Sequence, residues 1–82
     1  MPEPLEPREQ QALKLLVEFA GGSDVVHYSA LRKAGFPERL NEIYRSHSEY
    51  LDSLANRKFQ ILQHHGWIEL DKSSRIKILR RP

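Results

Sequence analysis

The segment from Ser46 to Arg81 constrains the fold most, because a helical pattern leads directly into two alternating strands. At helical spacing, Ser46–His65 separates into an apolar face and a polar face. The apolar face holds Leu51, Leu54, Ala55, Ile61, Leu62 and His65, with Tyr50 at its edge and Lys58 as its one charge. The polar face holds Glu49, Asp52, Ser53, Asn56, Gln60, Gln63 and His64. Gly66 is expected to end this helix.

The residues after Gly66 predict a β-hairpin. Trp67–Asp71 and Arg75–Arg80 alternate in period two and are joined by the polar Lys72-Ser73-Ser74. In such a hairpin one face would carry Ile68, Leu70, Ile76 and Ile78, and Glu69 on the other face would lie opposite Arg75 or Lys77. We interpret Trp67, at the junction of helix and strand, as a core or hinge aromatic rather than a stacking platform.

Upstream of this segment, the sequence predicts a proline-rich arm followed by several helices. Residues 1–6 are expected to be flexible, and Pro7 suits the first turn of a helix over 8–20 that Gly21-Gly22 stops. The wide apolar surface of Ala12–Ala20 implies that this helix packs on more than one neighbour. Val25–His27 would add a short third strand to the hairpin.

Two further short helices are expected between that strand and the long helix. Tyr28–Ala34 would place Ala30, Leu31 and Ala34 inward and Arg32 and Lys33 outward, and Gly35 would end it. Glu38–Arg45 would place Leu40, Ile43 and Tyr44 on one face. Ser46 with Glu49 forms a capping box, which favours a new helix at Ser46. One long bent helix stays open as an alternative, because no glycine or proline forces the break.

Composition and charge narrow the class of protein. Eighty-two residues without cysteine predict one domain over 7–82, with no disulfide and no thiolate metal site. No apolar run approaches the roughly 20 residues that span a bilayer, so we expect a soluble intracellular protein, cytoplasmic, nucleoid-associated or nuclear. Residues 1–26 carry a net charge of −3 and residues 27–82 a net charge of +5. This asymmetry indicates either a polyanionic partner or a solvated basic tail.

The predicted order of elements resembles the winged helix-turn-helix family. The resemblance rests on Val25–Ala34, on Ser46–His65 as the recognition helix, and on residues 66–71 with 75–80 as the wing. It implies a mostly helical α+β fold with three main helices, a short inserted helix, a C-terminal hairpin wing and a short third strand. Phe36–Arg45 departs from the family pattern, because family members pass from the second helix to the recognition helix in a few residues. This insert could itself be an interaction surface.

The resemblance further implies that the long helix enters the major groove of duplex DNA while the wing lies on phosphate. The helix residues that it designates are Ser53, Asn56, Arg57, Gln60, Gln63 and His64. The phosphate contacts that it designates are Lys72, Ser73, Arg75 and Lys77 on the wing, with Ser74, Arg80 and Arg81 near them, and Arg32 and Lys33 on the second helix. These types suit the task, because Asn and Gln can pair with adenine and Arg with guanine. Glu49 and Asp52 oppose it at the front of the helix, which moves the expected base contacts to Asn56, Arg57 and Gln60.

Two functions follow from these observations. The first is a small DNA-binding protein, a transcriptional regulator or an accessory factor in DNA transactions. The second is a protein–protein interaction module of the same fold without DNA contact, supported by the modest net charge of +2. Helix 8–20 or segment 37–45 would then bind a protein partner or a second copy in a homodimer. The spacing of His27, His47, His64 and His65 does not match a zinc site, and we expect no cofactor and no enzyme activity.

Overall fold

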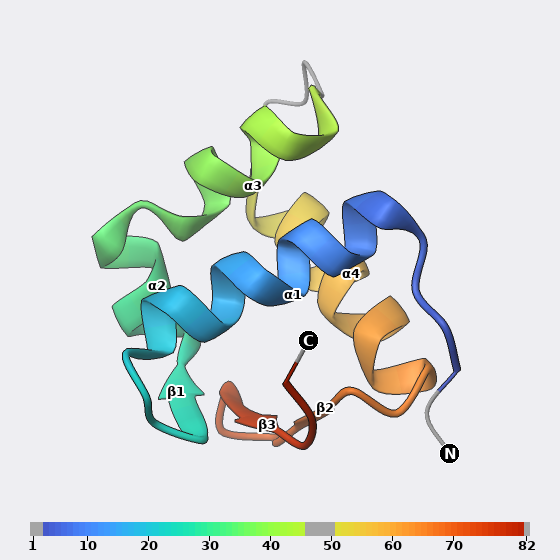
Figure 1. Cartoon of the computed structure of the whole chain (residues 1–82). Coiled ribbons are helices and arrows are strands. Elements are labelled where there is room, and N and C mark those ends of the chain that lie inside the picture. Colours follow the sequence, from blue (N-terminus) through green and yellow to red (C-terminus); the bar gives the residue numbers. More distant parts are fainter. Residues whose placement is uncertain (1–2, 46–50, 82) are drawn as a thin grey trace.

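The order of helices and strands along the chain is consistent with winged-helix topology. The computed structural model describes residues 3–45 and 51–81; for residues 51 and 52 it describes the backbone alone. Within these residues the elements are α1 (Pro7–Ala20), β1 (Val25–His27), α2 (Tyr28–Ala34), α3 (Phe36–Tyr44), α4 (Leu51–His64), β2 (Ile68–Leu70) and β3 (Arg75–Ile78). The strands gather at one end of the molecule and α3 lies at the other (Figure 1).

The sheet confirms both the predicted hairpin and the predicted third strand. Its order is β1-β3-β2, and both pairs are antiparallel. Ile68 lies opposite Ile78 and Leu70 opposite Ile76, as the alternation predicted. Glu69 lies opposite Lys77, which decides between the two cross-strand partners that the sequence allowed. On the other edge of β3, Val25 pairs with Lys77 and His27 with Arg75.

Helix α1 begins and ends where its sequence signals predict. Pro7 occupies the first turn, and Gly21 ends the helix in the left-handed conformation at φ 63°. Ala12, Leu13, Leu15 and Leu16 are buried, and the helix contacts both α3 and α4. The expectation of more than one packing neighbour is therefore confirmed.

Helix α2 has the predicted bounds, but its buried face is narrower than predicted. Leu31 is buried, whereas Ala30 and Ala34 are exposed rather than inward. A seven-residue helix offers only about two turns, and a single methyl group does not reach the core that the longer leucine side chain reaches. The prediction that Arg32 and Lys33 face outward is confirmed.

The inserted helix α3 is separate from α4, as the sequence favoured over one long bent helix. It begins at Phe36, two residues before the predicted start, and Arg45 ends it in the left-handed conformation at φ 49°. Phe36, Pro37 and Leu40 are buried, so the insert contributes to the core. The predicted capping box of Ser46 and Glu49 lies outside the described residues.

Helix α4 carries the apolar face that the sequence predicted and one large side chain that the prediction assigned to neither face. Leu54, Ala55 and Leu62 are buried, while Ile61 and His65 are half-buried. Phe59 is also buried, although the predicted faces omitted it. The predicted helix residues Ser46–Tyr50 lie outside the described part of the chain.

The one charge on the apolar face of α4 lies over an aromatic ring. The Nζ atom of Lys58 lies 4.2 Å from the centroid of the Tyr44 ring on α3, a cation–π contact. Burial, with the nearby charge of Glu9 as the second cause, raises the pKa of Tyr44 to about 12. Lys58 therefore lies over the uncharged form of the Tyr44 ring.

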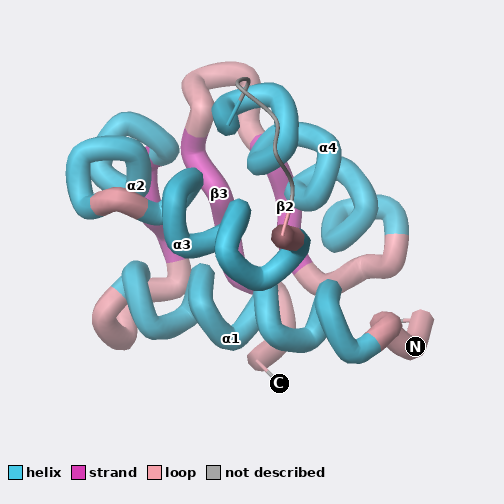
Figure 2. The backbone as a smooth tube through the Cα atoms, turned by 90° about the horizontal axis from the view of Figure 1, so that it is seen from above, coloured by secondary structure: helices cyan, strands magenta, loops and turns pink. Residues whose placement is uncertain are grey.

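Aromatic rings connect the helices through the core. Phe36 meets Phe19 edge-on with ring centroids 5.4 Å apart and stacks on Phe59 at 5.5 Å. Tyr28 in turn meets Phe59 edge-on at 5.9 Å. The series links α1, α3, α4 and α2, and Figure 2 shows α2 and α4 on opposite sides of the strands.

The N-terminal segment, expected to be a flexible arm over residues 1–6, makes specific contacts in its described part. Residues 3–6 have no regular structure, but Leu5 is buried. The Glu3 amide donates to the carbonyl of His65 at 3.0 Å, and the Trp67 indole N–H donates to the carbonyl of Glu3 at 2.7 Å. These contacts place the segment beside the C-terminal end of α4.

Within residues 3–45 and 51–81, no helix combines the length and apolar content needed to cross a membrane.

The turn between α2 and α3 depends on the left-handed conformation of Gly35, whose φ is 91°. We expect Gly35→Ala to lower the free energy of unfolding by about 1–2 kcal/mol, because a Cβ is unfavourable at this φ. A Cβ there would come no closer than 3.9 Å to Glu38, so steric overlap is not the cause. Urea denaturation measures the change. Gly35→Asn should cost less than Gly35→Ala, since Asn tolerates left-handed φ better, and a larger loss for Asn would contradict this account.

Candidate nucleic-acid interface

All six side chains predicted on α4 are exposed, and four of them line two different hollows at the helix surface. The six are Ser53, Asn56, Arg57, Gln60, Gln63 and His64. Asn56 lies on the flank of Phe59 and lines a pocket with the wing turn. Arg57, Gln60 and His64 line a shallow groove with Ile61 and His65 on a second flank, where Gln60 is the neighbour of Asn56 one helical turn later. The two flanks thus face different surroundings, which the helical pattern alone did not distinguish.

One predicted contact residue on α4 already has a structural partner. The Oε1 atom of Gln63 accepts a hydrogen bond from the backbone N–H of Leu70 at 2.7 Å. This bond joins α4 to the end of β2. Gln63 therefore helps to hold the helix against β2, while Asn56 and Gln60 occupy exposed positions two turns and one turn before it in α4.

The predicted wing cations Arg75 and Lys77 lie beside carboxylates on the outer face of the sheet. Arg75 donates from Nε and from a terminal guanidinium nitrogen to Oδ2 of Asp71, at 3.1 and 2.7 Å. These hydrogen bonds hold the pKa of the Asp71 carboxyl below its usual range. Lys77 lies opposite Glu69 in the strand register. Each cation thus has an acidic neighbour that reduces its attraction for phosphate.

The turn of the wing and α2 form a second cationic surface. The backbone N–H of Tyr28 donates to the carbonyl of Ser74 at 3.0 Å, which fixes the turn against the start of α2. The groove between them, called here the basic groove, is lined by Arg32, Lys33, His27, Ser29, Ser73 and Ser74, with Tyr28 at its inner edge. No carboxylate lines this groove among the described residues. Lys72 is exposed in the same turn.

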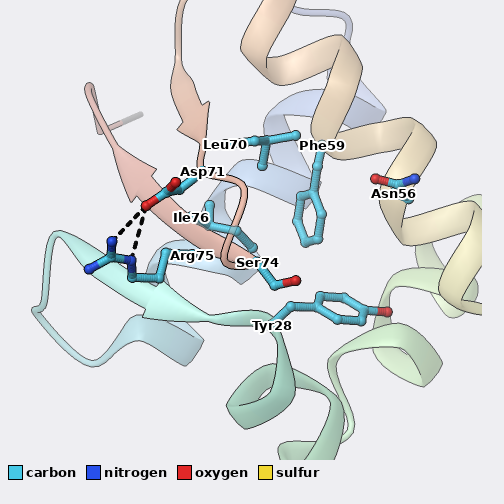
Figure 3. Close-up of a pocket in the computed structure, with 8 residues that line it drawn as sticks. All are labelled: Tyr28, Asn56, Phe59, Leu70, Asp71, Ser74, Arg75 and Ile76. Carbon is cyan, nitrogen blue, oxygen red and sulfur yellow. Dashed lines mark hydrogen bonds and ion pairs between the residues drawn. The ribbon is translucent and has the colours of Figure 1, made fainter.

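A pocket of about 370 Å³ lies between α4, the wing and Tyr28 (Figure 3). Phe59 and Ile76 form its apolar wall with Leu70, and Asn56 and Ser74 stand at its rim. Figure 3 shows the side chains of Asp71 and Arg75 paired with each other and directed away from the two aromatic rings. The pocket shares Tyr28 and Ser74 with the basic groove, so the two are contiguous.

The sequence prediction missed the pocket because its aromatic residues had no assigned role. Phe59 stands three residues before Leu62 and four after Ala55, and this helical spacing would have placed it on the flank of the apolar face. Tyr28 carries no comparable signal, since its position beside Ser74 depends on the pairing of β1 with β3.

The last two arginines lie at the other end of the sheet from the wing turn. Arg81 donates to Oδ1 of Asp24 at 2.9 Å and to the carbonyl of Gly22 at 3.4 Å. The Arg80 amide donates to the carbonyl of Trp67 at 3.3 Å. These contacts separate Arg80 and Arg81 from Lys72 and Ser73. In the described ranges, no group of three or more metal-ligating side chains comes together.

No family model matches the chain, and neither the curated proteins nor the solved structures include a significant match to it.

Proposed function

We propose that this chain is a small winged-helix DNA-binding protein that contacts duplex DNA through α4, the wing turn and α2. The observation that carries the proposal is the convergence of Arg32 and Lys33 with the hydroxyls of Ser73 and Ser74 in one groove free of carboxylates among its lining residues. That groove lies next to the exposed amide of Asn56, and cations with hydroxyls beside amides suit phosphate and base contacts respectively. A regulator or an accessory factor in DNA transactions would use such an interface.

The geometry changes which residues we expect to contact phosphates and which we expect to contact bases. Lys33 and Lys72 are preferred over Arg75 and Lys77 as phosphate contacts, because Arg75 and Lys77 lie beside Asp71 and Glu69. Arg32 and Ser73 line the basic groove together with Lys33. Asn56, Arg57 and Gln60 are the preferred base contacts, because Gln63 is bonded to Leu70. Asp52 and Glu49, which opposed the hypothesis at the front of the helix, lie outside the described side chains.

A protein-interaction module remains the second candidate, because the outer face of the sheet combines apolar and mixed-charge side chains. Val25 and Leu79 are 46% and 47% exposed, and Val25 lies opposite Lys77 in the register. Glu69 continues the same row on the other side of Lys77. Apolar side chains among opposite charges are typical of protein interfaces rather than of surfaces that contact phosphate. A partner or a second copy could also contact α1 or α3.

A salt titration of duplex binding tests the DNA proposal. With a labelled duplex of mixed sequence, we expect the logarithm of the association constant to fall linearly with the logarithm of salt concentration. Three or four phosphate contacts would give a slope of about −3, since each contact contributes ~0.9. Fluorescence anisotropy at four salt concentrations measures the slope. An absence of binding at low salt, or a slope near zero, would favour the interaction module instead.

A further inference from the structure

The pocket between α4 and the wing has the size and lining of a site for a flat ring. Its volume of about 370 Å³ falls within the range of small-molecule sites. Tyr28 is half-buried at its edge, and Phe59, Leu70 and Ile76 supply apolar surface. In Figure 3 the Phe59 ring points from α4 toward Tyr28, whose ring it meets edge-on, and the Ser74 hydroxyl lies near both rings. A flat group would contact carbon on several sides.

The polar groups at the rim suit the edge of a nucleobase. The Asn56 amide offers a donor and an acceptor together, which complements the paired donor and acceptor groups of a base. The Ser74 hydroxyl adds a group that can donate or accept. A purely aliphatic ligand would leave both of them unpaired, so the lining favours a heteroaromatic ring with hydrogen-bonding edges.

The surrounding charges indicate where a phosphate attached to that ring would lie. Asp71 at the rim of the pocket is ionised and paired with Arg75, so this side offers no net positive charge. The contiguous basic groove contains Arg32 and Lys33, and no carboxylate lines it among the described residues. A ligand with an apolar ring and an anionic group would therefore place the ring in the pocket and the anion in the groove.

We propose that the pocket and the basic groove together bind one unpaired nucleotide, with its base against Tyr28 and Phe59 and its phosphate beside Arg32 and Lys33. The nucleotide would come from an extrahelical position in DNA or from free nucleotide in solution. The first source rests on the proposed function, since it requires that the chain bind a duplex. In that case the protein prefers duplexes that carry a single unpaired nucleotide over fully paired ones.

Four labelled DNA probes with identical flanking sequences distinguish the contribution of the unpaired base to affinity from the contribution of the flexibility that a bulge introduces. They are a fully paired duplex, a duplex with one unpaired nucleotide, the same bulge with an abasic residue, and a single strand. We expect the base-bearing bulge to bind about tenfold more tightly than the abasic bulge, as stacking of one base on aromatic side chains would give. A purine mononucleotide, titrated directly into the protein by isothermal calorimetry, forms the fifth arm and reports the free-nucleotide source.

Two variants and a control connect the preference to the pocket. Tyr28→Leu removes the ring, and Asn56→Ala removes an exposed amide whose loss leaves the core intact. Both should reduce the ratio of base-bearing to abasic binding toward one. Gln11→Ala, which removes an exposed amide on α1 that lines neither the pocket nor the basic groove, should leave that ratio unchanged. Thermal unfolding shows whether the Tyr28→Leu variant is folded. If it is not, the comparison of binding ratios uses Asn56→Ala alone.

The outcomes distinguish this inference from the proposed function. Equal affinity for the base-bearing and abasic bulges, with normal binding to the paired duplex, overturns the inference and leaves the proposed function intact. Binding of the mononucleotide that depends on Tyr28, without duplex binding, supports the pocket with free nucleotide as its source and overturns the DNA proposal. Binding of none of the probes overturns both.

Discussion

Phe36→Ala should destabilise the fold by about 3–5 kcal/mol, the usual cost of removing a buried phenylalanine ring from a core. A domain of this length has a total stability of roughly 4–12 kcal/mol at ~0.05–0.15 kcal/mol per residue, so the loss is a large share of it. Phe36 is 1% exposed and contacts the rings of both Phe19 and Phe59. Alanine would remove the ring contacts that Phe36 makes with Phe19 and Phe59, and Phe59 would keep its edge-on contact with Tyr28. Guanidinium denaturation followed by circular dichroism measures the change.

Two matched variants show whether the effect comes from the position of the ring. Phe36→Leu keeps most of the buried volume and should cost less than half as much. Phe19→Ala removes a half-buried ring at the end of the aromatic series and should also cost less than Phe36→Ala. If Phe36→Ala cost under 1 kcal/mol, α3 would be an appendage to the domain rather than part of its cooperative unit.

The role of α3 marks one limit of what the sequence could predict. Hydrophobic alternation and helical spacing predicted the strands and the bounds of α1, because those signals are local. Phe36 precedes Pro37 in a segment whose residue types indicate a break between helices. No local sequence signal indicated that the Phe36 ring would reach Phe19 and Phe59. The prediction therefore began this helix at Glu38, whereas α3 begins at Phe36 and its first turn is part of the core.

The ion pairs of the candidate interface mark a second limit of what the sequence could predict. The sequence predicted the residue types on α4 and on the wing, and every one of those described side chains is exposed. The sequence did not predict which of the basic side chains would lie beside a carboxylate. Arg75 and Asp71 are only four residues apart, so a hairpin turn between them was a recognisable signal. Arg81 and Asp24 are joined only by the pairing of β1 with β3, as are Tyr28 and Ser74.

Lys33→Ala combined with Lys72→Ala should weaken binding to every duplex by about tenfold and make the salt slope shallower by about 2. The reason is that two phosphate contacts, each worth ~0.9 in slope, would be lost without any effect on base contacts. We avoid Arg75 in this test, because its removal would leave the Asp71 carboxylate without its partner and add repulsion. Lys14→Ala with Arg80→Ala removes the same charge from exposed positions outside the basic groove and should change the slope far less.

Asn56→Ala combined with Gln60→Ala should have a different signature if α4 lies in the major groove. Each bidentate contact to a base contributes roughly 1–3 kcal/mol of discrimination, so sequence preference should collapse while the salt slope stays the same. A selection from random duplexes with the unmodified chain provides the preferred site, and anisotropy against that site and a scrambled one measures the preference. Uniform losses of affinity from both pairs of substitutions would show that α4 contributes charge complementarity and no base recognition. The basic groove would then be the whole of the interface, and Asn56 would act only at the rim of the neighbouring pocket.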